Sequence, residues 1–119
     1  MNDVLVRGVW TAQQLAEVAS ALGRASIGLE GGGTWEGVAH YLVEDGAAAR
    51  EVLVAAGYVD VEVRPAVLVP LEADRPGALG RLMTDLAASG EDLVAQYSDH
   101  QNRKVLVMRE AFAATSRLR

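Results

Sequence analysis

The chain alternates short apolar stretches with segments whose apolar residues recur at helical spacing. The stretch Val4–Val9 is followed by Thr11 and, three residues later, by Gln14, which is the capping-box pattern that starts a helix. Apolar residues then recur at i, i+3, i+4 and i+7, as they do on one face of a helix: Leu15, Val18, Ala19 and Leu22. This part of the chain therefore predicts a strand followed by a helix.

The next segment indicates two strands joined by glycines. Ile27–Glu30 is a brief extended segment, and Val38–Val43 mixes apolar, β-branched and aromatic residues as strands do. Gly31–Gly33 lies between them. It lacks the following lysine and helix of a phosphate-binding loop, so we expect it to form the turn of an antiparallel hairpin.

A second helix and a last strand complete this half of the chain. Asp45 can cap the helix, and Gly57 can end it in the left-handed conformation. Tyr58–Val63 then alternates apolar and acidic residues, as a half-buried strand does. The predicted order is βαββαβ over Val4–Val63, for which the usual strand order in the sheet is 4-1-3-2.

The same order begins again after Pro65. Aligning Leu79 with Leu15 sets an offset of 64 residues, and Val18 and Leu22 then match Leu82 and Leu86. The second copy is predicted to contain a strand, a helix, two strands and the start of another helix: 67–73, 77–89, 93–97, 104–108 and 111–118. We therefore predict an α+β fold of tandem ferredoxin-like units, residues 1–65 and 66–119, each an antiparallel sheet with helices on one face.

The second unit lacks its last strand, which leaves Val67–Val69 as an unpaired edge. The unpaired N–H and C=O groups of an edge strand can pair with another strand. We expect either the last strand of the first unit or a second copy of the chain to cover this edge, and in the second case the protein is a homodimer.

Composition narrows the class of protein. The 119 residues are 50% hydrophobic and only 5% aromatic, so the core must be built from Ala, Val and Leu, which favours helices packed on a sheet. The absence of cysteine excludes disulfides and thiolate chemistry and fits a cytoplasmic location. No stretch resembles a signal peptide or reaches the ~20 apolar residues of a membrane span, so no membrane partner is expected.

The charge argues against a nucleic-acid partner. A formal charge of −5 would repel a phosphate backbone at neutral pH. Basic residues gather near the C-terminal end, where we interpret them as a solvated face.

The segment 67–94 reads VLVPLEADRPGALGRLMTDLAASGEDLV, with Asp74-Arg75-Pro76-Gly77 and Ala78-Leu79 between a predicted strand and a predicted helix. It resembles the ACT family of amino-acid-binding regulatory domains. The whole chain is similar to the small stand-alone tandem-ACT proteins of bacteria. The resemblance implies a ligand site formed by Asp74, Arg75, Pro76, Gly77, Ala78 and Leu79, with Asp92 at the start of the following strand as a second ligand-facing residue.

The residues of this loop suit a carboxylate independently of the resemblance. Pro76 presets the backbone for a first helical turn, Gly77 lets the backbone approach a ligand, and the free N–H groups of a helix N-terminus attract an anion. Asp74 could pair with the ammonium group of an amino acid. Alternatively, Asp74 merely caps the helix and Gly77 merely permits tight packing.

The first copy departs from the motif. The residues that match Asp74 to Gly77 are Trp10, Thr11, Ala12 and Gln13, and Gly28 stands where the second copy has Asp92. We therefore expect the ligand site on the second copy.

The leading hypothesis is a module that binds a free amino acid or similar small carboxylate and regulates a separate enzyme or transcription factor, with no catalysis, cofactor or metal of its own. One alternative is a small enzyme of the same topology with a site in a dimer cavity, where His40 or His100 acts as acid or base. Asp99 could then pair with His100. Neither histidine has a metal-ligand spacing. The other alternative is an assembly domain without a ligand.

Overall fold

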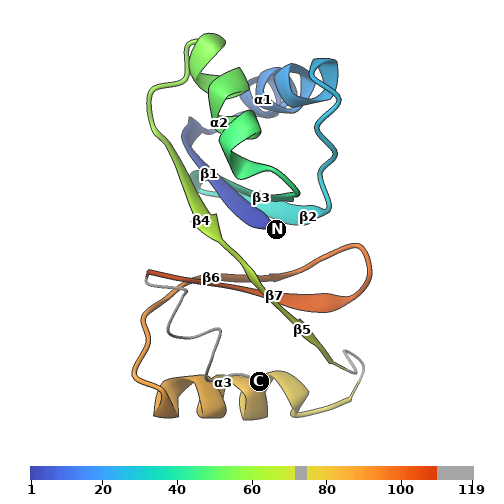
Figure 1. Cartoon of the computed structure of the whole chain (residues 1–119), viewed down its shortest axis with the longest axis vertical. Helices are drawn as coiled ribbons and strands as arrows, with labels where there is room; N and C mark the ends of the chain where they lie inside the picture. Colours follow the sequence, from blue (N-terminus) through green and yellow to red (C-terminus); the bar gives the residue numbers. More distant parts are fainter. Residues whose placement is uncertain (72–74, 110–119) are drawn as a thin grey trace. The chain divides into compact units, whose positions relative to one another are not determined.

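The computed structural model describes residues 1–71 and 75–109. The chain divides into two compact units, Met1–Arg64 and a second unit that starts at Pro65 (Figure 1). The first unit contains, in chain order, β1 (Asn2–Val9), α1 (Ala12–Arg24), β2 (Gly31–Trp35), β3 (Gly37–Val43), α2 (Gly46–Ala55) and β4 (Val61–Pro65). The second contains β5 (Val67–Pro70), α3 (Ala78–Ala88), β6 (Leu93–Ser98) and β7 (Arg103–Met108).

The first unit is a four-stranded sheet with two helices on one face. Its strand order is β2-β3-β1-β4, the order expected for βαββαβ, and β3 runs antiparallel to both β1 and β2. Figure 1 shows α1 and α2 on the same side of this sheet. The core lies between these layers and consists of small and medium apolar side chains, among them Val4, Val6, Val18, Leu22, Ala39, Val43, Ala49 and Leu53.

The second unit is a smaller version of the first. Its sheet has the order β5-β7-β6 in the described residues, with β7 antiparallel to both neighbours, and α3 packs on one face. Leu82 and Leu86 of α3 are buried against Leu106 and Met108 of β7. Their counterparts in the predicted repeat, Val18 and Leu22, are the buried residues of α1. The α+β fold of two ferredoxin-like units is thus confirmed, and β5 is a terminal strand of its sheet.

The local signals at the helix ends are also confirmed. Thr11 is the N-cap of α1, with both hydrogen bonds of a capping box. Asp45 is the N-cap of α2, and its carboxylate accepts from the Ala48 N–H at 3.0 Å. Gly57 has a φ of 102°, the left-handed conformation expected beyond a helix end.

The prediction for the glycine run was wrong. Gly31–Gly33 lies inside β2, paired with β3, and the hairpin turns at Glu36, three residues after the predicted turn ends. Gly32 has a φ of 128°, and a Cβ there would lie 2.0 Å from the His40 carbonyl oxygen. The Trp35 ring lies over Gly33, 3.0 Å from the position of a Cβ. Position 32 therefore requires glycine, because the partner strand's backbone leaves no room for a side chain, whereas at position 33 only the half-exposed Trp35 ring stands close.

The last strand of the first unit begins later than expected. β4 starts at Val61, whereas the alternation began at Tyr58, and Val59 is 96% exposed. The expected continuation of the second unit's first strand to residue 73, and its expected helix at 111–118, lie outside the described residues. None of the helices in the described ranges is long and apolar enough to cross a bilayer.

Candidate functional site

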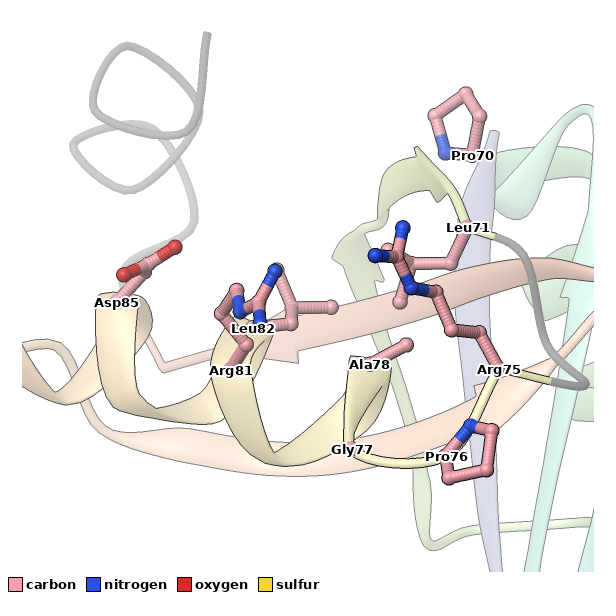
Figure 2. A pocket seen from close by; sticks show the side chains of 9 residues that line it. All are labelled: Pro70, Leu71, Arg75, Pro76, Gly77, Ala78, Arg81, Leu82 and Asp85. Carbon is pink, nitrogen blue, oxygen red and sulfur yellow. The ribbon is translucent and has the colours of Figure 1, made fainter.

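The loop before α3 opens onto a surface pocket. The pocket has a volume of about 270 Å³, which suits a molecule of amino-acid size. We call it the loop pocket. It is formed by the end of β5, the loop and one side of α3 (Figure 2), and its lining residues are Pro70, Leu71, Arg75, Pro76, Gly77, Ala78, Arg81, Leu82 and Asp85.

The backbone at the start of α3 is accessible. Gly77 is the N-cap residue with a φ of 85°, and a Cβ placed on it would meet no atom within 4 Å. The Ala78 N–H donates to the Arg75 carbonyl oxygen at 3.2 Å, and no side chain of the described residues caps the helix. The N–H groups of the remaining first turn can therefore donate to a bound anion. Asp74 lies outside the described residues, so the alternative in which it caps the helix stays open.

Charges around the loop pocket favour an anion at its loop end. Arg75 and Arg81 both line it, and the first turn of α3 contains no acidic residue. The positive end of the helix dipole adds to these two charges. Among the described lining residues Asp85 is the one carboxylate, and it lies two turns along α3 from Gly77, about 12 Å away at 1.5 Å per residue.

The corresponding helix start in the first unit is closed. Gln14 Oε1 accepts from the N–H groups of Trp10 at 2.6 Å and Thr11 at 3.1 Å, while the Thr11 hydroxyl accepts from the Gln14 N–H. The Thr11 hydroxyl thus occupies the Gln14 N–H, one of the first-turn donors that an anion would use, and the Gln14 side chain occupies the two N–H groups just before the helix. This contrast supports the expectation that the second unit, and not the first, carries the site.

The two helices also start at different points of the repeat. When Val18 is aligned with Leu82, Ala12 and Gln13 match Pro76 and Gly77. In the first unit these two residues are the first turn of α1, whereas in the second unit they still belong to the loop. The shorter α3 leaves the space that the loop pocket occupies.

The structure brings together part of the predicted residue set. Arg75, Pro76, Gly77 and Ala78 line the loop pocket, whereas Leu79 is 40% exposed and is not among the lining residues. Asp74 lies outside the described residues, so its predicted contact with an ammonium group stays a prediction.

Asp92 lies apart from the loop within one copy of the unit. It precedes β6, at the other end of α3, and lines a separate depression with Gly90, Glu91 and Arg109. Its carboxylate is 3.5 Å from Arg109 Nε, and both side chains are largely exposed. Since α3 has 11 residues, its ends are about 16 Å apart. A ligand of amino-acid size cannot contact both Gly77 and Asp92 of the same unit.

Sequence reasoning missed two charged residues of the loop pocket. Arg81 and Asp85 follow Gly77 at i+4 and i+8, a spacing that places successive residues along one side of a helix. That spacing was visible in the sequence. It had no meaning, however, until the helix start was located at Gly77.

His40 forms a buried pair with Asp3. His40 Nδ1 lies 2.9 Å from Asp3 Oδ2, across the paired strands β1 and β3, and the side chains are 9% and 0% exposed. Sequence analysis had not singled out Asp3. The pair lines neither the loop pocket nor the depression beside Asp92.

Asp99 is engaged by residues other than His100. Its carboxylate accepts from the backbone N–H groups of Gln101 at 3.0 Å and Arg103 at 2.8 Å, and from Arg103 Nε. Burial raises the pKa of Asp99, but the hydrogen bonds from Arg103 and Gln101 outweigh it and hold that pKa below its usual range. Asp99 thus stabilises the turn between β6 and β7, which is not the role of a general base.

The described residues also contain no cluster of three or more His, Cys, Asp or Glu side chains that could hold a metal ion.

Comparison with known proteins gives matches among solved structures. Neither a protein-family model nor a curated protein matches the sequence. The regulatory subunit of aspartate kinase from Thermus thermophilus, in its ligand-free form, has a TM-score of 0.70 at 17% identity, over 97% of this chain and 85% of that one. The corresponding subunit from Thermus flavus has a TM-score of 0.64 at 16% identity, over 98% and 88%.

Protein BT0572 from Bacteroides thetaiotaomicron is also similar, with a TM-score of 0.66 at 23% identity over 91% of this chain and 76% of that one. At these identities the likeness concerns the fold. The matches include the regulatory subunits of an amino-acid kinase, and they cover both units of the chain. The chain therefore has an ACT-like fold, as its resemblance to that family predicted.

Proposed function

We propose that this chain is a regulatory module that binds a free amino acid or related small carboxylate in the loop pocket. The observation that carries the proposal is the difference between the two helix starts. The first turn of α1 is capped by Thr11 and Gln14, whereas α3 begins at Gly77 with no side-chain cap from the residues that the structure describes. An anion that accepts from the open N–H groups of α3 replaces the missing cap.

Several features of the loop pocket suit such a ligand. The carboxylate would accept hydrogen bonds from the first turn of α3 and from Arg75, and Leu71 and Leu82 offer apolar contacts to its carbon chain. Asp74 is the proposed partner of the ammonium group. Asp92 would have to come from a second copy, which agrees with the proposal that the protein works as a homodimer.

Regulation of a partner enzyme or transcription factor is the second part of the proposal. The similarity to regulatory subunits of aspartate kinase supports a role of this kind. A ligand regulates a partner only if it binds two states of the module with different affinity. The proposed module performs no catalysis itself, and it acts by changing how the units or the copies pack.

A thermal-shift panel of the common amino acids and simple carboxylates tests the ligand. A ligand at about 100 times its dissociation constant should stabilise the fold by ~2.7 kcal/mol. Asp74→Ala and Gly77→Val should abolish this stabilisation, each judged against the variant's own melting temperature. Gln13→Ala is the matched control at the position equivalent to Gly77, and it should respond as the wild type does.

Two results contradict the proposal. If no compound of the panel stabilises the wild-type protein, the chain is better explained as an assembly domain. If Gln13→Ala abolishes the response while Asp74→Ala and Gly77→Val retain it, the site lies on the first unit.

A further inference from the structure

The charges of the loop pocket define the ligand more narrowly than a carboxylate in general. Resting on the proposed function, we propose that the pocket selects a short dicarboxylate, such as an acidic amino acid, over compounds with a single carboxylate. The proposal depends on Arg81, which neither the motif nor the resemblance singles out.

Arg81 provides a second position for an anion. It lies one helical turn after Gly77, which is about 6 Å along the axis of α3. The Arg81 N–H donates to the Gly77 carbonyl oxygen at 3.0 Å, but the Arg81 guanidinium makes no hydrogen bond or ion pair with the described residues. In Figure 2 the side chains of Arg81 and Arg75 rise on either side of Ala78 into the same space. A guanidinium group binds a carboxylate through two parallel hydrogen bonds, so its position suits a carboxylate particularly well.

The spacing of about 6 Å between Gly77 and Arg81 along the axis of α3 suits a short dicarboxylate. One carboxylate would accept from the open N–H groups beyond Gly77, and the other would pair with Arg81. The carboxyl carbons of four- and five-carbon dicarboxylates are about 4–5 Å apart, given carbon–carbon bonds of about 1.5 Å. With the reach of hydrogen bonds at both ends, such a molecule spans the two positions. A compound with a single carboxylate would leave one of them unused.

Asp85 limits the length of the ligand. It lines the pocket one turn beyond Arg81, and it makes no ion pair with the described residues. A longer dicarboxylate would bring its second carboxylate past Arg81 and toward this negative charge, where the two repel each other. Asp85 is thus a specificity-determining residue, whereas Arg81 is a binding residue.

Isothermal titration of the full chain at constant ionic strength tests the proposal. The probes are glutamate, aspartate and succinate as short dicarboxylates, leucine and butyrate as compounds with one carboxylate, pimelate as a long dicarboxylate, and inorganic phosphate. The short dicarboxylates should bind at least tenfold more tightly than each of the other four. Arg81→Gln should weaken them tenfold to a hundredfold, the equivalent of one charge-assisted interaction, without changing the affinity for leucine.

Two further variants separate local from general effects of charge. Arg50→Gln removes one positive charge from α2 of the first unit and should leave every affinity unchanged. Asp85→Asn should increase the affinity for pimelate severalfold and change the affinity for succinate less than twofold.

The outcomes distinguish this inference from the proposed function. If leucine binds as tightly as glutamate and Arg81→Gln changes neither affinity, the pocket binds carboxylates without preferring dicarboxylates. Only this inference then fails. Tightest binding of phosphate would also overturn it, because phosphate cannot span the two positions. If no probe binds, both the inference and the proposed ligand fail.

Discussion

Thr11 and Gln14 close the first turn of α1 through two reciprocal hydrogen bonds, each 3.1 Å long. The Thr11 hydroxyl accepts from the Gln14 N–H, and the Gln14 side chain accepts from the Thr11 N–H. The N-cap of α3 is Gly77, which has no side chain to do the same. The first unit therefore contains a helix N-terminus with a side-chain capping box, and the second contains one whose N-cap residue has no side chain. The candidate site lies at the second.

Replacing Thr11 with Ala should destabilise the protein without affecting its ligand response. The loss of an N-cap hydroxyl costs about 1 kcal/mol, here in the free energy of unfolding measured with urea. The shift in melting temperature caused by a carboxylate should equal that of the wild type. A reduced shift would mean that the start of α1 takes part in binding.

Gly32 and Gly33 should differ sharply when each is changed to Ala. A Cβ at Gly32 would lie 2.0 Å from the His40 carbonyl oxygen, and its φ of 128° disfavours any other residue, so we expect a loss of about 3 kcal/mol or more. At Gly33 the neighbour is the ring of Trp35, which is half exposed and can move. That variant should lose about 1 kcal/mol or less. Similar urea midpoints for the two variants would contradict the register of β2.

The turn between β6 and β7 should make stability depend on pH through Asp99. The pKa of this carboxyl lies below its ordinary value of 3.8 in the folded protein, so its contribution is fully present above that value. The contribution is lost as the pH falls from about 4 through the folded-state pKa. Asp99→Asn removes the charge and should lower the free energy of unfolding at pH 7 by about 1–3 kcal/mol.

The control for this effect is the difference between wild type and Asp99→Asn at several pH values. The difference should be constant between pH 5 and 7 and should shrink below about pH 4. A difference that grows as the pH falls would mean that the folded state does not favour the charged carboxylate.

The terminal strand β5 should take part in self-association. It is apolar at Val67, Leu68 and Val69, and terminal strands with unpaired backbone groups recruit further strands. We expect light scattering at about 100 µM to give the mass of a homodimer. A monomer mass at that concentration would contradict the prediction and would also leave Asp92 without a route to the loop pocket.

The sequence by itself determined the elements whose signals are local. Apolar spacing located α1 and α3, and the capping residues Thr11 and Asp45 lie where the structure places them. These features depend on residues three or four positions apart, so a window of the sequence contains the whole interaction. The internal repeat also followed from the sequence, because Val18 and Leu82 must each bury an apolar side chain against a sheet.

Only the tertiary structure decided the path of Gly31–Gly33 and the extent of the loop pocket. Glycine usually indicates a turn, but here the approach of the His40 backbone from across the hairpin requires glycine at position 32, inside a strand. The predicted motif residues 75–78 lie in the pocket, yet Arg81 and Asp85 joined them only through the folded helix, and Asp92 lies at its far end. Contacts between residues far apart in the chain depend on how helix and strands pack, and no local pattern records that.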